Sequence, residues 1–161
     1  MRKLLPFLIS CGIAGCAGAP QAPTPAMTNA NDDHAMMTAM LPGTSTIKGQ
    51  ASARTASGEV RNGAGVTISL LPMTPYVATC LKGHTFTDSP CASKLANYRM
   101  QTPADGDGRF VFLKLKPGTY YLEATMPWGV PSQPGGASAG GTFSTQATIK
   151  TDDQEVVADI H

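Results

Sequence analysis

The sequence has little charge, few aromatic side chains and few histidines. Charged residues make up 14% of the 161 residues and aromatic residues 6%, and there are three histidines and one tryptophan. The 12 Lys and Arg nearly balance the 11 Asp and Glu, which argues against the basic surface that nucleic-acid binding requires. His34, His84 and His161 are scattered, and no Ser, Cys or carboxylate forms a recognisable catalytic motif with them. The sequence therefore predicts a protein that is not an enzyme, needs no cofactor and has no nucleic-acid partner.

Long apolar runs are also absent, apart from a short one at the N-terminus. Arg2 and Lys3 precede the apolar stretch Leu4 to Ile13, which is too short to cross a bilayer as a stable helix. It leads into Ile13-Ala14-Gly15-Cys16, a motif that resembles the lipobox of bacterial lipoproteins. The resemblance implies a signal peptide over residues 1–15 and acyl chains on Cys16, which hold the protein to a membrane without spanning it.

The membrane that this anchor selects is suggested by the next residue. Ala17 stands where an aspartate often signals retention in the inner membrane, so we expect a lipid anchor in the cell envelope, at the outer membrane of a Gram-negative source. Two other interpretations stay open: an ordinary secretory signal cut near Ala17 to Ala19, and an uncleaved anchor.

Residues 16–44 are rich in Pro, Ala, Thr and Asn and contain no aromatic residue. Such a segment buries too little apolar surface to offset its ordering entropy, so we expect a lipidated cysteine followed by a flexible tether. Within it, His34 lies close to Met36, Met37 and Met40, and imidazole and thioether ligands suit Cu(I). The favoured interpretation is a solvated linker with a transient helical turn and no bound metal.

From residue 45 onward, apolar and polar residues alternate with the period of a β-strand. Turn-forming pairs such as Asn62-Gly63 and Pro117-Gly118 separate the alternating segments. The expected strands lie near residues 47–54, 66–70, 98–102, 109–115, 120–126, 143–149 and 155–160. Seven short strands with one apolar face each predict a single all-β domain over 45–161, an antiparallel two-sheet sandwich.

Several short motifs carry a family resemblance. They are Ile47-x-Gly49, Gly63-Ala64-Gly65-Val66, Asp105-x-x-Gly108-Arg109-Phe110 and Leu115-x-Pro117-Gly118-x-Tyr120. In this order they resemble the carboxypeptidase regulatory-like domain, a prealbumin-like β-sandwich, over most of residues 45–126. The resemblance implies an accessory, non-catalytic module. It brings no zinc site, because the metal of such proteins belongs to a peptidase domain.

Two of the four cysteines remain for a disulfide. Cys11 leaves with the signal peptide and Cys16 carries lipid, so Cys80 and Cys91 form an even pair outside the cytoplasm. We expect a disulfide that staples an insertion over Met73 to Asn97. A metal site is the weaker alternative, because only His84 lies between the two sulfurs.

Two surfaces are expected to bind a protein partner or a ligand. The insertion offers Tyr76, His84 and Phe86, and the region after it offers Tyr121 and Trp128. Trp128 either packs over the end of the sandwich, which is the favoured interpretation, or serves as a stacking platform for a sugar ring or a proline of a partner. The favoured function is a membrane-anchored lipoprotein that binds another envelope protein or supports an envelope assembly. The alternative is a lipoprotein that binds glycans, or metal through the tether.

Overall fold

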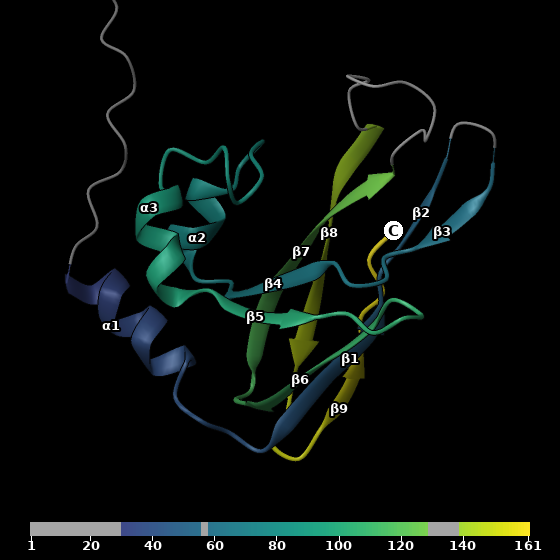
Figure 1. Cartoon of the computed structure of the whole chain (residues 1–161). Helices are drawn as coiled ribbons and strands as arrows, with labels where there is room; N and C mark the ends of the chain where they lie inside the picture. The colour runs from purple at the N-terminus through teal and green to yellow at the C-terminus, as the bar shows by residue number, and fades with distance from the viewer. Residues whose placement is uncertain (1–29, 56–57, 129–138) are drawn as a thin grey trace, which may run out of the picture.

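The computed structural model describes residues 30–55, 58–128 and 139–161. The expected signal peptide, Cys16 and the first part of the tether lie outside these ranges. The described elements run in the order α1 (Ala30–Ala39), β1 (Ser45–Gln50), β2 (Ser52–Arg54), β3 (Val60–Asn62), β4 (Thr67–Pro72), α2 (Pro75–Cys80), α3 (Ala92–Leu95), the 3-10 turn η1 (Ala96–Tyr98), β5 (Met100–Pro103), β6 (Arg109–Leu115), β7 (Gly118–Trp128), β8 (Ala139–Ile149) and β9 (Glu155–Val157) (Figure 1). No helix in these ranges has the length and apolar character needed to cross a membrane.

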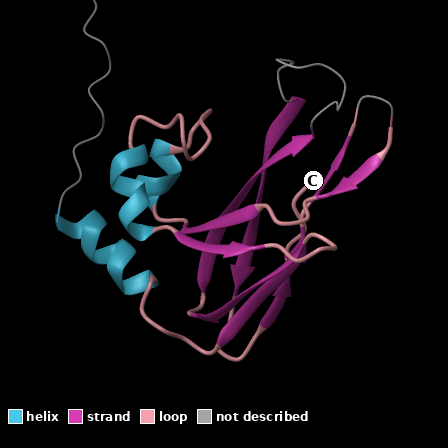
Figure 2. Cartoon of the chain, viewed as in Figure 1, coloured by secondary structure: helices cyan, strands magenta, loops and turns pink. Residues whose placement is uncertain are grey.

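Strands are the main regular structure of the described chain, and they form two main sheets and a hairpin (Figure 2). One sheet has the strand order β5-β4-β7-β8 and the other β6-β1-β9, while β2 and β3 pair only with each other. The four-stranded sheet is antiparallel throughout. In the smaller sheet β1 pairs antiparallel with β6 and parallel with β9. The predicted all-β class is confirmed.

The predicted count of seven antiparallel strands is not confirmed, because nine strands occur in the described ranges. The expected strand at 47–54 is interrupted at Ala51, whose N–H donates to the carbonyl of Gly108 at 2.8 Å. Beyond Ala51 the chain leaves β6 and pairs with β3, an arm that the alternation pattern did not predict. The number of strands thus depends on where the neighbouring strand of each pair ends, and the alternation of residues along one segment does not encode that.

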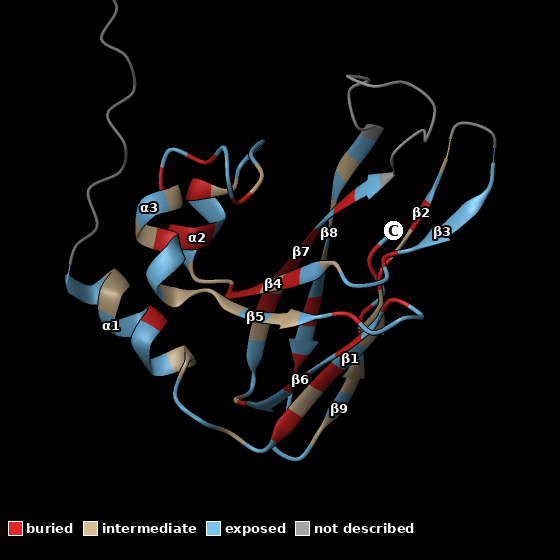
Figure 3. Ribbon diagram, in the orientation of Figure 1, coloured by how far each residue is buried: buried red, intermediate tan, exposed pale blue. Residues whose placement is uncertain are grey.

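The core lies between the two sheets (Figure 3). Along β6, Phe110 and Phe112 are buried while Val111 and Leu113 are exposed, as the period of two requires. The two phenyl rings meet edge to face, with centroids 6.1 Å apart. From the facing sheet, buried β7 side chains such as Leu122 complete the same cluster.

Two glycines allow close approaches that a side chain would block. A Cβ on Gly49 would lie 2.0 Å from the carbonyl oxygen of Ala158, where the C-terminal segment runs alongside β1. Gly108 has φ of +80° and closes the turn between β5 and β6. In that turn the Asp105 carboxylate accepts the N–H groups of Asp107 at 2.9 Å and Arg109 at 2.8 Å. Asp105 therefore stabilises the turn by Asx hydrogen bonding.

The insertion between β4 and β5 forms α2, α3 and η1 around the Cys80–Cys91 disulfide. The Sγ–Sγ distance is 2.06 Å and the Cα–Cα distance 5.7 Å, which confirms the predicted pairing. Thr74 caps α2 by accepting the N–H of Val77 at 3.3 Å. Together with Leu71 of β4, the insertion builds a second apolar cluster beside the sandwich from Tyr76, Val77, Cys80, Phe86, Cys91 and Leu95.

Part of the expected flexible tether is an ordered helix docked on that insertion. Met36 of α1 is 0% exposed and belongs to the second cluster. The Asp33 carboxylate forms an ion pair with Lys94 and accepts a hydrogen bond from the hydroxyl of Tyr98 at 3.1 Å. The hydrogen bond from Lys94 holds the pKa of Asp33 below its usual value. The composition predicted a flexible tether here. The helix α1 buries a single side chain, Met36, and it does so against an insertion that is distant in sequence.

Candidate functional site: a polar groove on the four-stranded sheet

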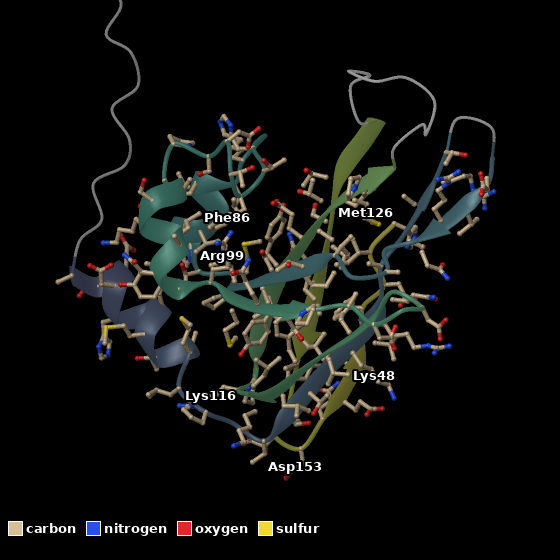
Figure 4. The ribbon with its side chains drawn as sticks, in the orientation of Figure 1. Lys48, Phe86, Arg99, Lys116, Met126 and Asp153 are labelled. Carbon is tan, nitrogen blue, oxygen red and sulfur yellow. A yellow bond between two sulfur atoms is a disulfide. The ribbon has the colours of Figure 1, made fainter. Side chains whose placement is uncertain are left out.

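A groove of about 430 Å³ lies on the outer face of the four-stranded sheet. Its floor is made of polar side chains from three strands, namely Thr67, Ser69, Gln101, Glu123 and Thr125. Phe86 and Thr87 of the insertion border one end together with Arg99, which directly precedes β5, and Gly65 and Pro127 border the other end. Figure 4 shows Phe86 and Arg99 near the insertion and Met126, next to Pro127, toward the far end of β7.

The register of the strands places the floor residues in a row. Ser69 of β4 lies opposite Gln101 of β5 on one side and Glu123 of β7 on the other. The Gln101 amide Nε2 lies 3.5 Å from the Ser69 hydroxyl, to which it donates. An amide, a hydroxyl and a carboxylate thus follow one another across neighbouring strands. Together they offer both donors and acceptors.

Glu123 is the buried member of this row, with only 5% of its surface exposed. Its Oε2 atom accepts the backbone N–H of Phe86 at 2.8 Å and the hydroxyl of Tyr121 at 2.7 Å. These two hydrogen bonds compensate for the burial of the carboxylate. Glu123 therefore joins the insertion to the sheet and fixes the position of the groove wall.

The protonated hydroxyl of Tyr121 helps to hold the Glu123 carboxylate in place. Burial raises the pKa of Tyr121 to about 12, the Ser144 hydroxyl lowers it, and the Glu123 carboxylate raises it. The phenol is therefore protonated at neutral pH, and its O–H donates a hydrogen bond to the Glu123 carboxylate.

Arg99 stands at the insertion end of the groove. Its guanidinium carbon lies 4.3 Å from the centroid of the Phe86 ring, a cation-π contact. Among the residues that the structure describes, no carboxylate lies within ion-pair distance of Arg99. The planar guanidinium is thus positioned by an aromatic face and keeps donors available for a ligand.

The structure separates the residues that the sequence suggested for binding. Tyr76 is buried in the second cluster, His84 is exposed on the insertion, and Phe86 forms part of the groove wall. Tyr121 lies beside the groove and supports Glu123. The side chain of Trp128 lies outside the described part of the structure.

The most informative site residues, Ser69, Arg99, Gln101 and Glu123, were not identified from the sequence. The available signal was Glu123 itself, a charged residue inside an otherwise strongly apolar and aromatic strand. Its partners come from other strands, and their register is not visible in one sequence.

The suggested copper ligands are in different environments. Met36 is buried in the second cluster, whereas His34 is exposed and Met37 is 62% exposed. Met40 is half-buried. Across the described ranges, no cluster of three or more His, Cys, Asp and Glu side chains is arranged to hold a metal ion.

No protein-family model matches the chain, and no curated protein matches it. Among solved structures, it is similar to the crystal structure of a "putative carbohydrate binding protein" from Pseudomonas aeruginosa. The sequence identity is 24%, the alignment covers 79% of this chain and 95% of that chain, and the TM-score is 0.58. This similarity establishes a shared fold.

Proposed function

We propose that the protein is a non-catalytic saccharide-binding module whose ligand lies in the groove of the four-stranded sheet. The observation that carries the proposal is the row of Gln101, Ser69 and Glu123 beside the Arg99 guanidinium. Sugar hydroxyl groups both donate and accept hydrogen bonds, and this row offers both kinds of partner. The groove volume of about 430 Å³ falls in the usual range of small-molecule sites, roughly 300 to 1,000 Å³.

Two further points support this function. The similar Pseudomonas aeruginosa structure is named for carbohydrate binding. In addition, glycoside hydrolysis normally needs two carboxyl groups on either side of the scissile bond. Of the described residues that line the groove, Glu123 is the one carboxylate, and it is engaged with Phe86 and Tyr121. Binding without cleavage is therefore the chemistry that the groove favours.

The proposed location is the cell envelope. Acyl chains on Cys16 would hold the module at the membrane, with the outer membrane favoured by Ala17. The carboxypeptidase regulatory-like resemblance fits this proposal, since such a domain is an accessory with no chemistry of its own. Metabolic labelling with an alkyne fatty acid, compared between the wild-type protein and Cys16→Ala, tests the anchor.

A glycan array tests the proposed function, with the processed full-length protein extracted from the membrane in detergent. We expect binding to at least one saccharide class, followed by a measurable Kd in titration calorimetry. Gln101→Ala should weaken it about tenfold, because a groove hydrogen bond worth about 1.4 kcal/mol is lost. Gln50→Ala is the matched control, since Gln50 lies on the other sheet and donates to the carbonyl of Asp107 at 2.7 Å. An array without any binding, or equal losses in both variants, would contradict the proposal.

A second candidate function is docking to another envelope protein. It is favoured by exposed apolar side chains on the outer face of the smaller sheet. Leu113 and Val157 are each 64% exposed, and Val111 and Val157 flank Lys48 in the strand register. A photocrosslinker at Leu113 should capture one envelope protein in stoichiometric amount, whereas a crosslinker at Asp152, on the exposed turn before β9, should not.

A further inference from the structure

We infer that the groove is the middle of a longer binding track, and that its ligand is an internal stretch of a linear oligosaccharide that crosses the strands. This inference rests on the proposed saccharide-binding function and specifies its substrate class. It follows from the direction in which the groove is walled and from the polar face that continues beyond it.

The walls of the groove stand at the two ends of the strands. Arg99 directly precedes β5, and Gly65 precedes β4. Because β4 and β5 are antiparallel, these two residues lie at opposite ends of the strand pair. Phe86 lies on the same side as Arg99, and Pro127 on the same side as Gly65. A ligand held between the two walls must therefore extend across the strands, from β5 toward β8.

The floor continues past the groove onto the edge strand β8. Glu123 is paired with Ser144, and Thr125 with Thr142. The hydroxyl oxygens of Thr125 and Thr142 lie 3.0 Å apart, and both residues are exposed. The row that begins at Gln101 thus runs over all four strands and ends at Ser144.

The length of this row exceeds a single sugar ring. Neighbouring strands lie about 4.8 Å apart, so a row across four strands spans roughly 14 Å. A second row, from Thr125 to Thr142, lies about 7 Å further along the strands. Two parallel rows of hydroxyl, amide and carboxylate groups can contact successive sugar units of one chain.

Both ends of the track lie at sheet edges. The strand order puts β5 at one edge of the sheet and β8 at the other. The outward residues of β8 from Thr142 to Thr148 are all polar: Thr142, Ser144, Gln146 and Thr148. A linear chain can therefore leave the track at either edge, which favours internal segments of a polymer over a chain end.

The test measures affinity against chain length with titration calorimetry on the full-length, detergent-extracted protein. The probes are oligomers of two to six units of β-1,4-linked glucose, β-1,4-linked N-acetylglucosamine and α-1,4-linked galacturonate. In at least one series, the Kd should fall by about tenfold between two and four units and then level off, because contacts on β8 add to those in the groove.

The double variant Thr142→Ala/Ser144→Ala tests the β8 part of the track. It should weaken binding of the hexamer about tenfold and binding of the dimer by clearly less, because the dimer is held mainly by the groove residues on β4, β5 and β7. Thr148→Ala is the control, because Thr148 lies on the same face of β8 but faces Thr119, two register positions beyond Tyr121. Thermal unfolding of each variant verifies that it is folded.

Equal affinities for dimer and hexamer, or an unchanged hexamer Kd in the double variant, would overturn the track while leaving saccharide binding intact. Failure of all three series to bind would also overturn the track. If the glycan array were empty as well, the proposed function would fall with it.

Discussion

The backbone N–H of Phe86 donates a hydrogen bond of 2.8 Å to the carboxylate of Glu123, a residue 37 positions away in the chain. This bond joins a disulfide-stapled insertion to the centre of the larger sheet. It also compensates for the burial of the Glu123 carboxylate, which is 5% exposed. The groove wall at Phe86 and the groove floor at Glu123 therefore depend on one another.

Replacing Glu123 with Ala should lower the free energy of unfolding by roughly 2 kcal/mol, because the Phe86 N–H and the Tyr121 hydroxyl lose their acceptor. Urea denaturation followed by circular dichroism measures this change. Glu59→Ala is the control: Glu59 is exposed and pairs with Arg61 at 3.2 Å, so we expect a loss below about 0.5 kcal/mol. Matching denaturation midpoints for the two variants would show that Glu123 does not anchor the insertion.

Met36→Ala should destabilise the protein by roughly 2 kcal/mol, since the Met36 side chain is 0% exposed in the second cluster. Met37 lies next to it on α1 and is 62% exposed, so Met37→Ala should have almost no effect. Urea midpoints of the two full-length variants distinguish a docked helix from a solvated tether. Equal and small effects would favour the tether that the composition predicted.

Removing the disulfide by Cys80→Ala/Cys91→Ala should cost about 3 kcal/mol, as expected for releasing a short closed loop in the unfolded chain. The variant should also bind saccharide more weakly, because the insertion carries Phe86, whose ring positions Arg99. Chemical denaturation and calorimetry measure the two effects. Wild-type protein incubated with dithiothreitol should match the variant, and undiminished stability in both would contradict the structural role of the bridge.

Stability should fall at alkaline pH partly through Tyr121. Its pKa is raised to about 12 in the folded protein, whereas an unperturbed tyrosine titrates near 10. The folded state therefore holds the phenolic proton more tightly than the unfolded state. The contribution of Tyr121 to the free energy of unfolding is complete below pH of about 10 and is lost as the pH rises toward about 12.

Unfolding free energies of wild-type protein and Tyr121→Phe, measured between pH 8 and 12, isolate this contribution. The wild type should lose stability more steeply than the variant above pH of about 10. Parallel pH profiles for the two proteins would rule out the raised pKa. Tyr120, whose pKa burial also raises, is unchanged in both proteins and does not affect the difference.

The sequence by itself determined the class of fold and the composition of the core. Alternating apolar residues in segments such as 109–115 specify which side chains face inward, because the side-chain period of a strand is two. Turn residues such as Gly108 mark where strands end, and the even cysteine pair at Cys80 and Cys91 identified the disulfide. These features are local, or depend on counting, so one chain is enough to predict them.

Only the tertiary structure decided the groove and the docking of α1. Gln101, Ser69 and Glu123 come from three separate strands, and alternation within each strand does not specify which strands are neighbours or in what register they pair. Met36 is buried because the insertion folds next to it, and nothing in the surrounding residues signals that partner. The site arises from contacts between segments distant in sequence, and those contacts exist only once the sheets and the insertion have packed together.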